Sequence, residues 1–154
     1  MNKSLLEKWG YLVELIACSL LMVIVVLIWG ADAISGFIGA SSSDISSYFS
    51  VGMFAAATAF YWAFYSKSDT PFANWLYEKG AYKVYSRAYL WAIGVYAALS
   101  VMLFIAKSVN NHYVSLATFW LLLLGVVNVY TFFNNIASQL RLNMEFNKRR
   151  GKQP

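Results

Sequence analysis

Four long apolar stretches, separated by short polar segments, fill most of the chain. They cover residues 9–29, 48–65, 88–106 and 113–137. An α-helix rises 1.5 Å per residue, so about 20 apolar residues cross a hydrocarbon layer about 30 Å thick. Each stretch reaches or nearly reaches that length. The pattern therefore predicts an all-α, polytopic membrane protein with four transmembrane helices in an up-down bundle.

The composition indicates a membrane protein with a single domain. The chain has 154 residues, of which 60% are hydrophobic and 12% are charged, whereas about 25% of an ordinary soluble domain is charged. No segment outside the four stretches is long enough to bury a core of its own, so we expect one integral membrane domain over residues 1–154. The first stretch is longer than the roughly 7–15 apolar residues of a signal peptide, and we expect it to be retained as a span.

Basic residues lie at alternate ends of the apolar stretches. All but one of the 12 Lys and Arg residues fall in the N-terminal segment, the connector over 66–87 or the C-terminal segment, and the exception is Lys107. Cytoplasmic loops of membrane proteins carry the excess of Lys and Arg. The pattern predicts that both termini and the 66–87 connector are cytoplasmic. This distribution of basic residues is typical of a protein of the bacterial inner membrane.

The C-terminal segment 138–154 is predicted to be a cytoplasmic basic tail, with the last helix continuing into residues 141–145. Its cationic cluster consists of Lys148, Arg149, Arg150 and Lys152. A basic cluster that directly follows a span contacts anionic lipid headgroups more often than nucleic acid. We therefore expect the bilayer, with anionic headgroups, to be its partner.

Small residues recur four positions apart in two of the stretches, a spacing that places them on one helix face. They are Gly52, Ala55, Ala56 and Ala59 in the second stretch and Gly94 and Ala98 in the third. Because small side chains let helix backbones approach closely in lipid, these residues are predicted to make the tightest helix contacts. A pore lined by small residues is the alternative.

The connector between the second and third stretches is the most organised polar segment. Thr70 and Pro71 are typical of a helix start, and Gly80 is suited to end that helix. We expect an amphipathic helix lying at the membrane surface before the third span begins. Its candidate interfacial residues, which could instead dock a cytoplasmic partner, are Phe72, Trp75, Tyr82, Tyr85 and Arg87.

The segment over 30–47, on the opposite side, is rich in Gly and Ser. It is predicted to be a loop, with a turn and a helix cap at residues 41–44.

One carboxylate and a row of amides mark a polar site within the spans. Glu14 is the only acidic residue inside any stretch, and Asn128, Thr131 and Asn135 recur at three- and four-residue steps in the fourth. The predicted topology places all of them in the cytoplasmic half. One interpretation is structural, with hydrogen bonds between helices worth about 0.6–2 kcal/mol each. The other is a proton or ion relay, which is less favoured because a transport route needs polar groups at and beyond the midplane.

Other site chemistry finds little support in the sequence. The single histidine, His112, cannot supply paired haem ligands, and the single cysteine, Cys18, cannot form an intramolecular disulfide. No His, Cys, Asp or Glu spacing fits a metal, and no glycine-rich phosphate loop is present. We therefore expect no catalysis and no cofactor.

These observations predict a non-catalytic integral membrane subunit that forms homo-oligomers or docks a membrane or cytoplasmic partner. Such a subunit would scaffold, sense or anchor a membrane assembly. A homo-oligomeric ion channel or small transporter with a polar cytoplasmic vestibule is the alternative. A membrane immunity, exclusion or phage-defence factor is a further alternative by analogy only.

Overall fold

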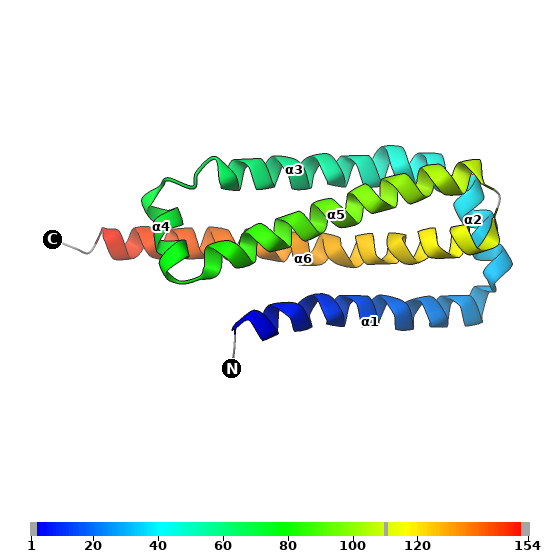
Figure 1. Ribbon diagram of the computed structural model, residues 1–154, viewed down its shortest axis with the longest axis horizontal. Coiled ribbons are helices and arrows are strands. Elements are labelled where there is room, and N and C mark those ends of the chain that lie inside the picture. The colour runs from blue at the N-terminus through cyan, green and yellow to red at the C-terminus, as the bar shows by residue number, and fades with distance from the viewer. Residues whose placement is uncertain (1–2, 110, 152–154) are drawn as a thin grey trace.

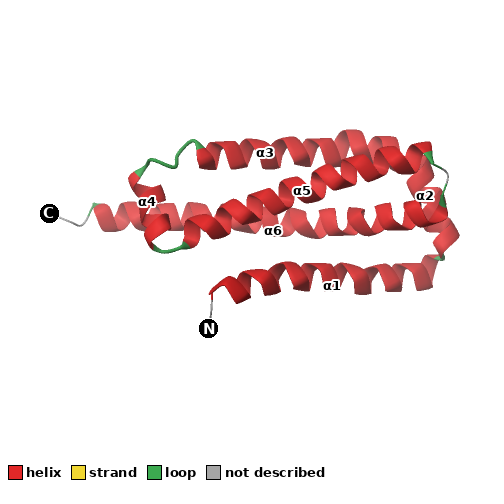
Figure 2. Cartoon of the chain, in the orientation of Figure 1, coloured by secondary structure: helices red, strands yellow, loops and turns green. Residues whose placement is uncertain are grey.

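The computed structural model describes residues 3–109 and 111–151, and side chains from Tyr11 onward within those ranges. All regular structure in these residues is helical, which confirms the predicted all-α class (Figures 1 and 2). The elements are α1 (Lys3–Trp29), α2 (Ala31–Asp44), the π-helix η1 (Ile45–Ser50), α3 (Val51–Tyr65), α4 (Pro71–Glu78), α5 (Ala81–Ser108) and α6 (His112–Arg150).

Four of the helices, α1, α3, α5 and α6, run along the long axis of the molecule (Figure 1). The two shorter helices, α2 and α4, lie at opposite ends of this bundle. The start of α1 and the C-terminal end of α6 lie at the end that carries α4. We call this end the α4 end, and the opposite one the α2 end.

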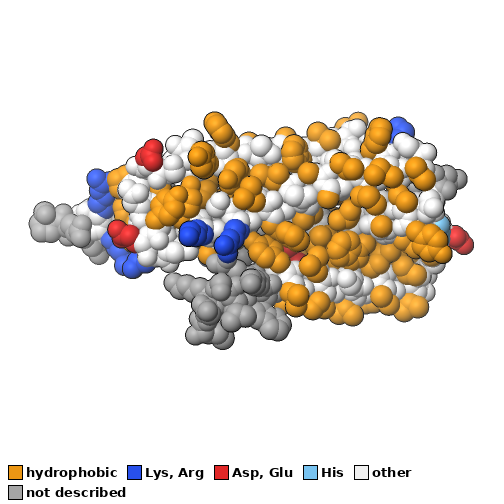
Figure 3. Space-filling model, viewed as in Figure 1, with side chains coloured by type: hydrophobic (Ala, Val, Ile, Leu, Met, Phe, Trp, Pro, Cys, Tyr) orange, Lys and Arg blue, Asp and Glu red, His pale blue; other side chains and the backbone are white. Residues whose placement is uncertain are grey.

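Three of the described helices are long and apolar enough to cross a membrane. They are α1 over Tyr11–Trp29, α5 and α6, with hydropathies of 2.8, 2.0 and 1.9. Large apolar side chains cover much of the visible surface, whereas Lys and Arg gather mainly toward the α4 end (Figure 3). These features indicate a multi-pass membrane protein.

The segment over 30–47 is not the loop that its composition predicted. Gly30, with a φ of 81°, ends α1 and redirects the chain, and a helix starts again at Ala31. Ile34 and Ile38 are one turn apart and fully buried, because they pack against Phe119 at the α2 end. This apolar contact outweighs the weak helix propensity of Gly and Ser. Residues 41–44 form the last turn of α2 and continue into η1 without a cap or a loop.

Helix α4 confirms the predicted short helix in the connector. The Thr70 side chain accepts a hydrogen bond from the Ala73 N–H (3.3 Å), and Pro71 occupies the first turn. Gly80 adopts a φ of 69°, which allows the chain to turn sharply into α5. Both ends of α4 therefore follow from residue types that the sequence displays.

Two helices are longer than the spans predicted from them. Helix α5 begins at Ala81 rather than 88, since the chain has no helix breaker after Gly80. Helix α6 is continuous through residues 141–145, as predicted, and extends further, to Arg150 within the basic segment. Arg149 forms a salt bridge with Glu145 one turn earlier, an arrangement that supports the last turns of a helix.

The core of the bundle surrounds α5, which contacts α2, α3, α4 and α6. Near the α4 end the core is aromatic: Phe64, Tyr82, Tyr89 and Phe132 are buried together. Helix α1 lies outside this core and contacts α6 and, less extensively, α2. The candidate site lies where α1 meets α5 and α6.

Candidate functional site

The four polar residues predicted to cluster within the spans line one cavity of about 200 Å³ between α1, α5 and α6. The lining residues are Tyr11, Glu14, Val84, Ala88, Trp91, Asn128, Thr131, Phe132, Asn134 and Asn135. We call this cavity the Glu14 pocket. Three helices thus contribute to it, and α1 supplies its carboxylate.

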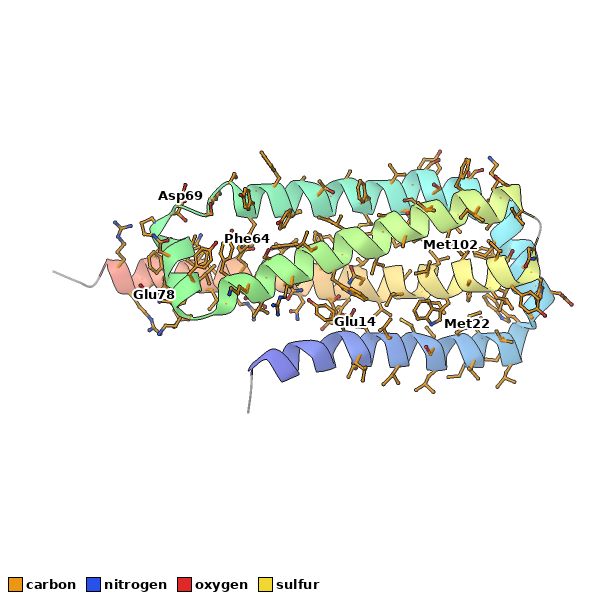
Figure 4. The ribbon with its side chains drawn as sticks, viewed as in Figure 1. Glu14, Met22, Phe64, Asp69, Glu78 and Met102 are labelled. Atoms are coloured by element: carbon orange, nitrogen blue, oxygen red, sulfur yellow. The ribbon has the colours of Figure 1, made fainter. Side chains whose placement is uncertain are left out.

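Glu14 projects from α1 toward α5 and α6 (Figure 4). The Trp91 Nε1–H donates a hydrogen bond to Glu14 Oε2 (3.2 Å). The Trp91 ring also lies 5.1 Å from the Tyr11 ring, centroid to centroid. Because an unpaired carboxylate in a span is costly, this indole bond helps to hold Glu14 and α1 against α5.

Asn128 is the most deeply buried polar residue of the pocket, with 2% of its surface exposed. Its Oδ1 accepts no hydrogen bond from the described residues, while its backbone oxygen accepts one from Thr131 Oγ1 (3.0 Å). A buried acceptor without a donor costs about 1–3 kcal/mol. A ligand that donates a hydrogen bond to Asn128 Oδ1 would therefore gain more binding free energy there than at any other atom of this pocket.

The remaining amides lie closer to the surface. Asn135 is half-buried and Asn134 is exposed, so the amides of the pocket are more exposed toward the α4 end of α6. The cavity thus combines one carboxylate with amide groups at increasing exposure. This arrangement can hydrogen-bond a polar or cationic group, and its described lining residues include no paired acid and base.

Trp91 is a site residue that the sequence interpretation missed. It is the fourth residue of the apolar stretch over 88–106, a position typical of the interfacial belt that tryptophans form. Its place in the stretch therefore gave no signal of a partner, and only the helix arrangement brings its indole N–H to Glu14.

A second indole bond fixes α1 farther along its length. The Trp120 Nε1–H of α6 donates to Ser19 Oγ (3.2 Å), and Ser19 Oγ donates to its own helix at the Leu15 oxygen (2.8 Å). Cys18, beside Ser19, is fully buried and reduced, and it fills the contact with Leu124 and Val95. Two tryptophans on two different helices therefore anchor one face of α1.

The predicted small-residue faces point away from the bundle. A Cβ atom at Gly52 or Gly94 would meet no other atom within 4 Å. Ala55, Ala59 and Ala98 are exposed, and Ala56 is half-buried. Within the chain these residues do not form the tightest helix contacts, because larger side chains such as Phe64 fill the buried face of α3.

Among the described glycines, Gly125 of α6 has the nearest neighbours from other helices. A Cβ there would lie 3.3 Å from Leu99 Cδ2 and 3.4 Å from Phe49 Cε1. The Tyr96 hydroxyl donates to the Gly125 oxygen (3.3 Å). The sequence interpretation did not single out Gly125, since no second small residue four positions away accompanies it.

The candidate docking residues of the connector are divided between core and surface. Tyr82 is buried, with its ring centroid 4.6 Å from Phe64 and 3.9 Å from Tyr77, so it belongs to the core and not to an exposed surface. Phe72 and Trp75 are half-buried, and each ring lies 5.7 Å from Phe146 of α6. Tyr85 is half-buried and Arg87 is exposed.

The basic C-terminal residues are exposed as far as the structure describes them. Lys148, Arg149 and Arg150 are exposed at the end of α6, and Lys152 lies outside the described residues. Among the residues that the structure describes, no three His, Cys, Asp or Glu side chains come together as metal ligands. His112 Nδ1 lies 3.6 Å from Asp32 Oδ1 at the α2 end.

Comparison with known proteins finds no matching family profile, no similar curated protein and no similar solved structure.

Proposed function

We propose that the protein is a non-catalytic subunit of the bacterial inner membrane that self-associates through the outward small-residue faces of α3 and α5. The carrying observation is that Gly52 and Gly94 lie on the outside of the bundle, with nothing within 4 Å of a Cβ at either position. In lipid, helices associate by close packing and not by exclusion of water. A second copy of the chain is the occupant to which the proposal commits, and a different membrane protein is the alternative outcome of its test.

The proposal includes a fourth span made of η1 and α3. Helix α3 has 15 residues and follows the 6 residues of η1 without a break. A continuous helix of this combined length rises about 30 Å, enough to cross the hydrocarbon layer. Helix α3 also runs alongside α5 in the bundle, as a fourth span would (Figure 1).

The orientation follows from the basic residues. With the α4 end in the cytoplasm, both ends of the chain and the Lys-rich connector are cytoplasmic, as the positive-inside rule requires. Helix α4 then lies at the headgroup level of the inner leaflet, with Ala73 and Leu76 turned into the protein.

Native mass spectrometry in mild detergent tests self-association. We expect wild-type oligomers, and we expect Gly52→Leu and Gly94→Leu to shift the population to monomers. Gly39→Leu is the matched control, since Gly39 is also helical with nothing within 4 Å but lies on α2. A monomeric wild type, or equal dissociation by the control, would contradict the proposal.

A channel or small transporter is a second candidate, which the Glu14 pocket favours. The supporting observation is the buried Asn128 Oδ1 that accepts no bond from the described residues. A proteoliposome flux assay separates the two functions. Glu14→Gln removes the charge but keeps an oxygen that Trp91 can bond to. Proton or ion flux that is present in the wild type and lost in this variant would replace the scaffold proposal.

A further inference from the structure

A groove of about 530 Å³ lies between α3, α4 and α6 at the α4 end of the bundle. It is distinct from the Glu14 pocket, whose walls come from α1, α5 and α6. None of the residues in the proposed association faces lines it. The groove is therefore separate from both the Glu14 pocket and the association faces.

One end of the groove is apolar. Its lining there includes Phe60 and Phe64 of α3 and Ile136 and Leu140 of α6. Phe64 is 7% exposed and belongs to the aromatic core, and Phe60 meets Phe132 edge-on at 5.7 Å. This half is suited to bind a hydrocarbon chain, and the packing of these side chains holds its walls in place.

The other end of the groove is polar and cationic. Lys67, just after α3, and Arg150, at the end of α6, both line it and are both exposed. Asn143, Asn147 and Arg150 recur at four- and three-residue steps, so they share one face of α6. No acidic residue is among the described residues that line the groove. This half therefore favours an anion.

Helix α4 closes the groove at its side. Phe72 contacts Phe146, with ring centroids 5.7 Å apart, and Ala73 and Leu76 are buried beneath. The groove is thus a shaped site between three helices and not a flat exposed patch. Its volume falls within the range of about 300–1,000 Å³ that is typical of small-molecule sites.

We propose that this groove binds one anionic phospholipid of the adjacent leaflet. The phosphate lies between Lys67 and Arg150, and an acyl chain lies along Phe60, Phe64 and Leu140. Basic pockets between transmembrane helices on the cytoplasmic side bind phosphate-bearing headgroups. A soluble phosphate would leave the apolar half unfilled, so a bilayer lipid fits the whole groove better. The proposal does not depend on self-association.

Native mass spectrometry of the full chain, with added phosphatidylglycerol or phosphatidylcholine, tests the cationic half. Lys67→Gln/Arg150→Gln is expected to reduce the preference for phosphatidylglycerol about thirtyfold, since each cation near an anionic headgroup contributes about 1 kcal/mol. The matched control is Lys83→Gln/Arg141→Gln, which like the test pair removes one Lys and one Arg. It removes the same charge from exposed helical positions outside the groove. An equal loss in both double variants would show general attraction to the surface and overturn the proposal.

A steric variant tests the apolar half with both cations intact. Ala63→Phe fills the groove, whereas Ala59→Phe adds the same volume one turn away, outside it. We expect Ala63→Phe to lose phosphatidylglycerol and Ala59→Phe to retain it, whatever Ala59→Phe does to association. Retention by Ala63→Phe would overturn the proposal. Displacement of the lipid by equimolar soluble glycerol phosphate would also overturn it, by assigning the site to a soluble anion.

Discussion

Helices α1 and α5 are both long and strongly apolar, yet they occupy opposite positions in the protein. The more hydrophobic of the two, α1, has 6% of its apolar segment buried, against 33% for α5. In water the more hydrophobic helix would be expected at the centre. In lipid, hydrophobicity gives no preference for the inside, because the surrounding hydrocarbon is equally apolar.

The central place of α5 follows from its side chains that fill space and form hydrogen bonds. Tyr89 and Tyr96 are almost fully buried, and the Tyr89 hydroxyl donates to Gln139 Oε1 (2.6 Å). Helix α1 instead presents Leu, Ile and Val on its exposed face, and it is held by Trp91 and Trp120 along one edge. Shape and hydrogen bonds, and not hydropathy, therefore distinguish a central span from a peripheral one here.

The largest effect should come from removing the Tyr96 side chain, which fills the contact at the middle of α5. Tyr96 is fully buried, bonds to Gly125 and meets Phe49 edge-on. We expect Tyr96→Ala to lower the free energy of unfolding by about 3–5 kcal/mol, the cost of removing a large buried aromatic side chain. Steric-trapping measurements in bicelles would show it. Tyr130→Ala is the control, because Tyr130 is 74% exposed; similar losses in both variants would contradict the central role of α5.

A bulkier residue at the crowded Gly125 position should have the next largest effect. Gly125→Leu places a side chain against Leu99 and Phe49, which already lie within 3.4 Å of a Cβ atom there. We expect it to destabilise the chain by about 1–3 kcal/mol, as overpacking usually does. Gly94→Leu, measured in the monomer by the same method, should leave stability nearly unchanged. The reverse order would place the tight helix contact on the other face of α5.

Loosening α1 should leave the rest of the bundle intact. Trp91→Phe and Trp120→Phe each remove one indole hydrogen bond, which is worth about 0.6–2 kcal/mol in a membrane. Cys18 is a fully buried residue of α1 that packs against Val95 and Leu124, so it reports the separation of α1 directly. We expect its alkylation by a membrane-permeant maleimide to accelerate about three- to thirtyfold.

The control for this labelling is Trp62→Phe, on the exposed side of α3. Unchanged Cys18 labelling in the Trp91 and Trp120 variants would mean that apolar packing alone holds α1. The indole bonds would then be incidental to its position.

The sequence predicted features that depend on local chemistry. The ends of α4 follow from Thr70, Pro71 and Gly80, whose preferences operate within a few residues. The placement of Glu14 and Asn128 in one pocket was also predictable, because polar residues within spans turn toward one another. The spacing of these residues and their depth along the spans were enough to predict these features without knowledge of the helix arrangement.

Features that depend on contacts distant in sequence were not predictable. The composition of the segment over 30–47 predicts a loop, but the segment is helical because Ile34 and Ile38 pack against Phe119. The same limit applies to the small residues, since spacing identified the Gly52 face but not the side on which it lies. A helix in lipid can turn either face inward, and only its neighbours decide which.

The smallest expected effect concerns the hydroxyl pair that joins α5 to η1. Ser50 Oγ donates to the Tyr96 oxygen (3.0 Å) and also bonds to Ser100 Oγ. Because Ser50 keeps its bond to the backbone in Ser100→Ala, we expect a loss of only about 0.6 kcal/mol, the average for such bonds in membranes. A double-mutant cycle with Ser50→Ala measures the coupling between the two hydroxyls. A coupling well above that value would mean that hydrogen bonds, more than the aromatic packing around Tyr96, set the central position of α5.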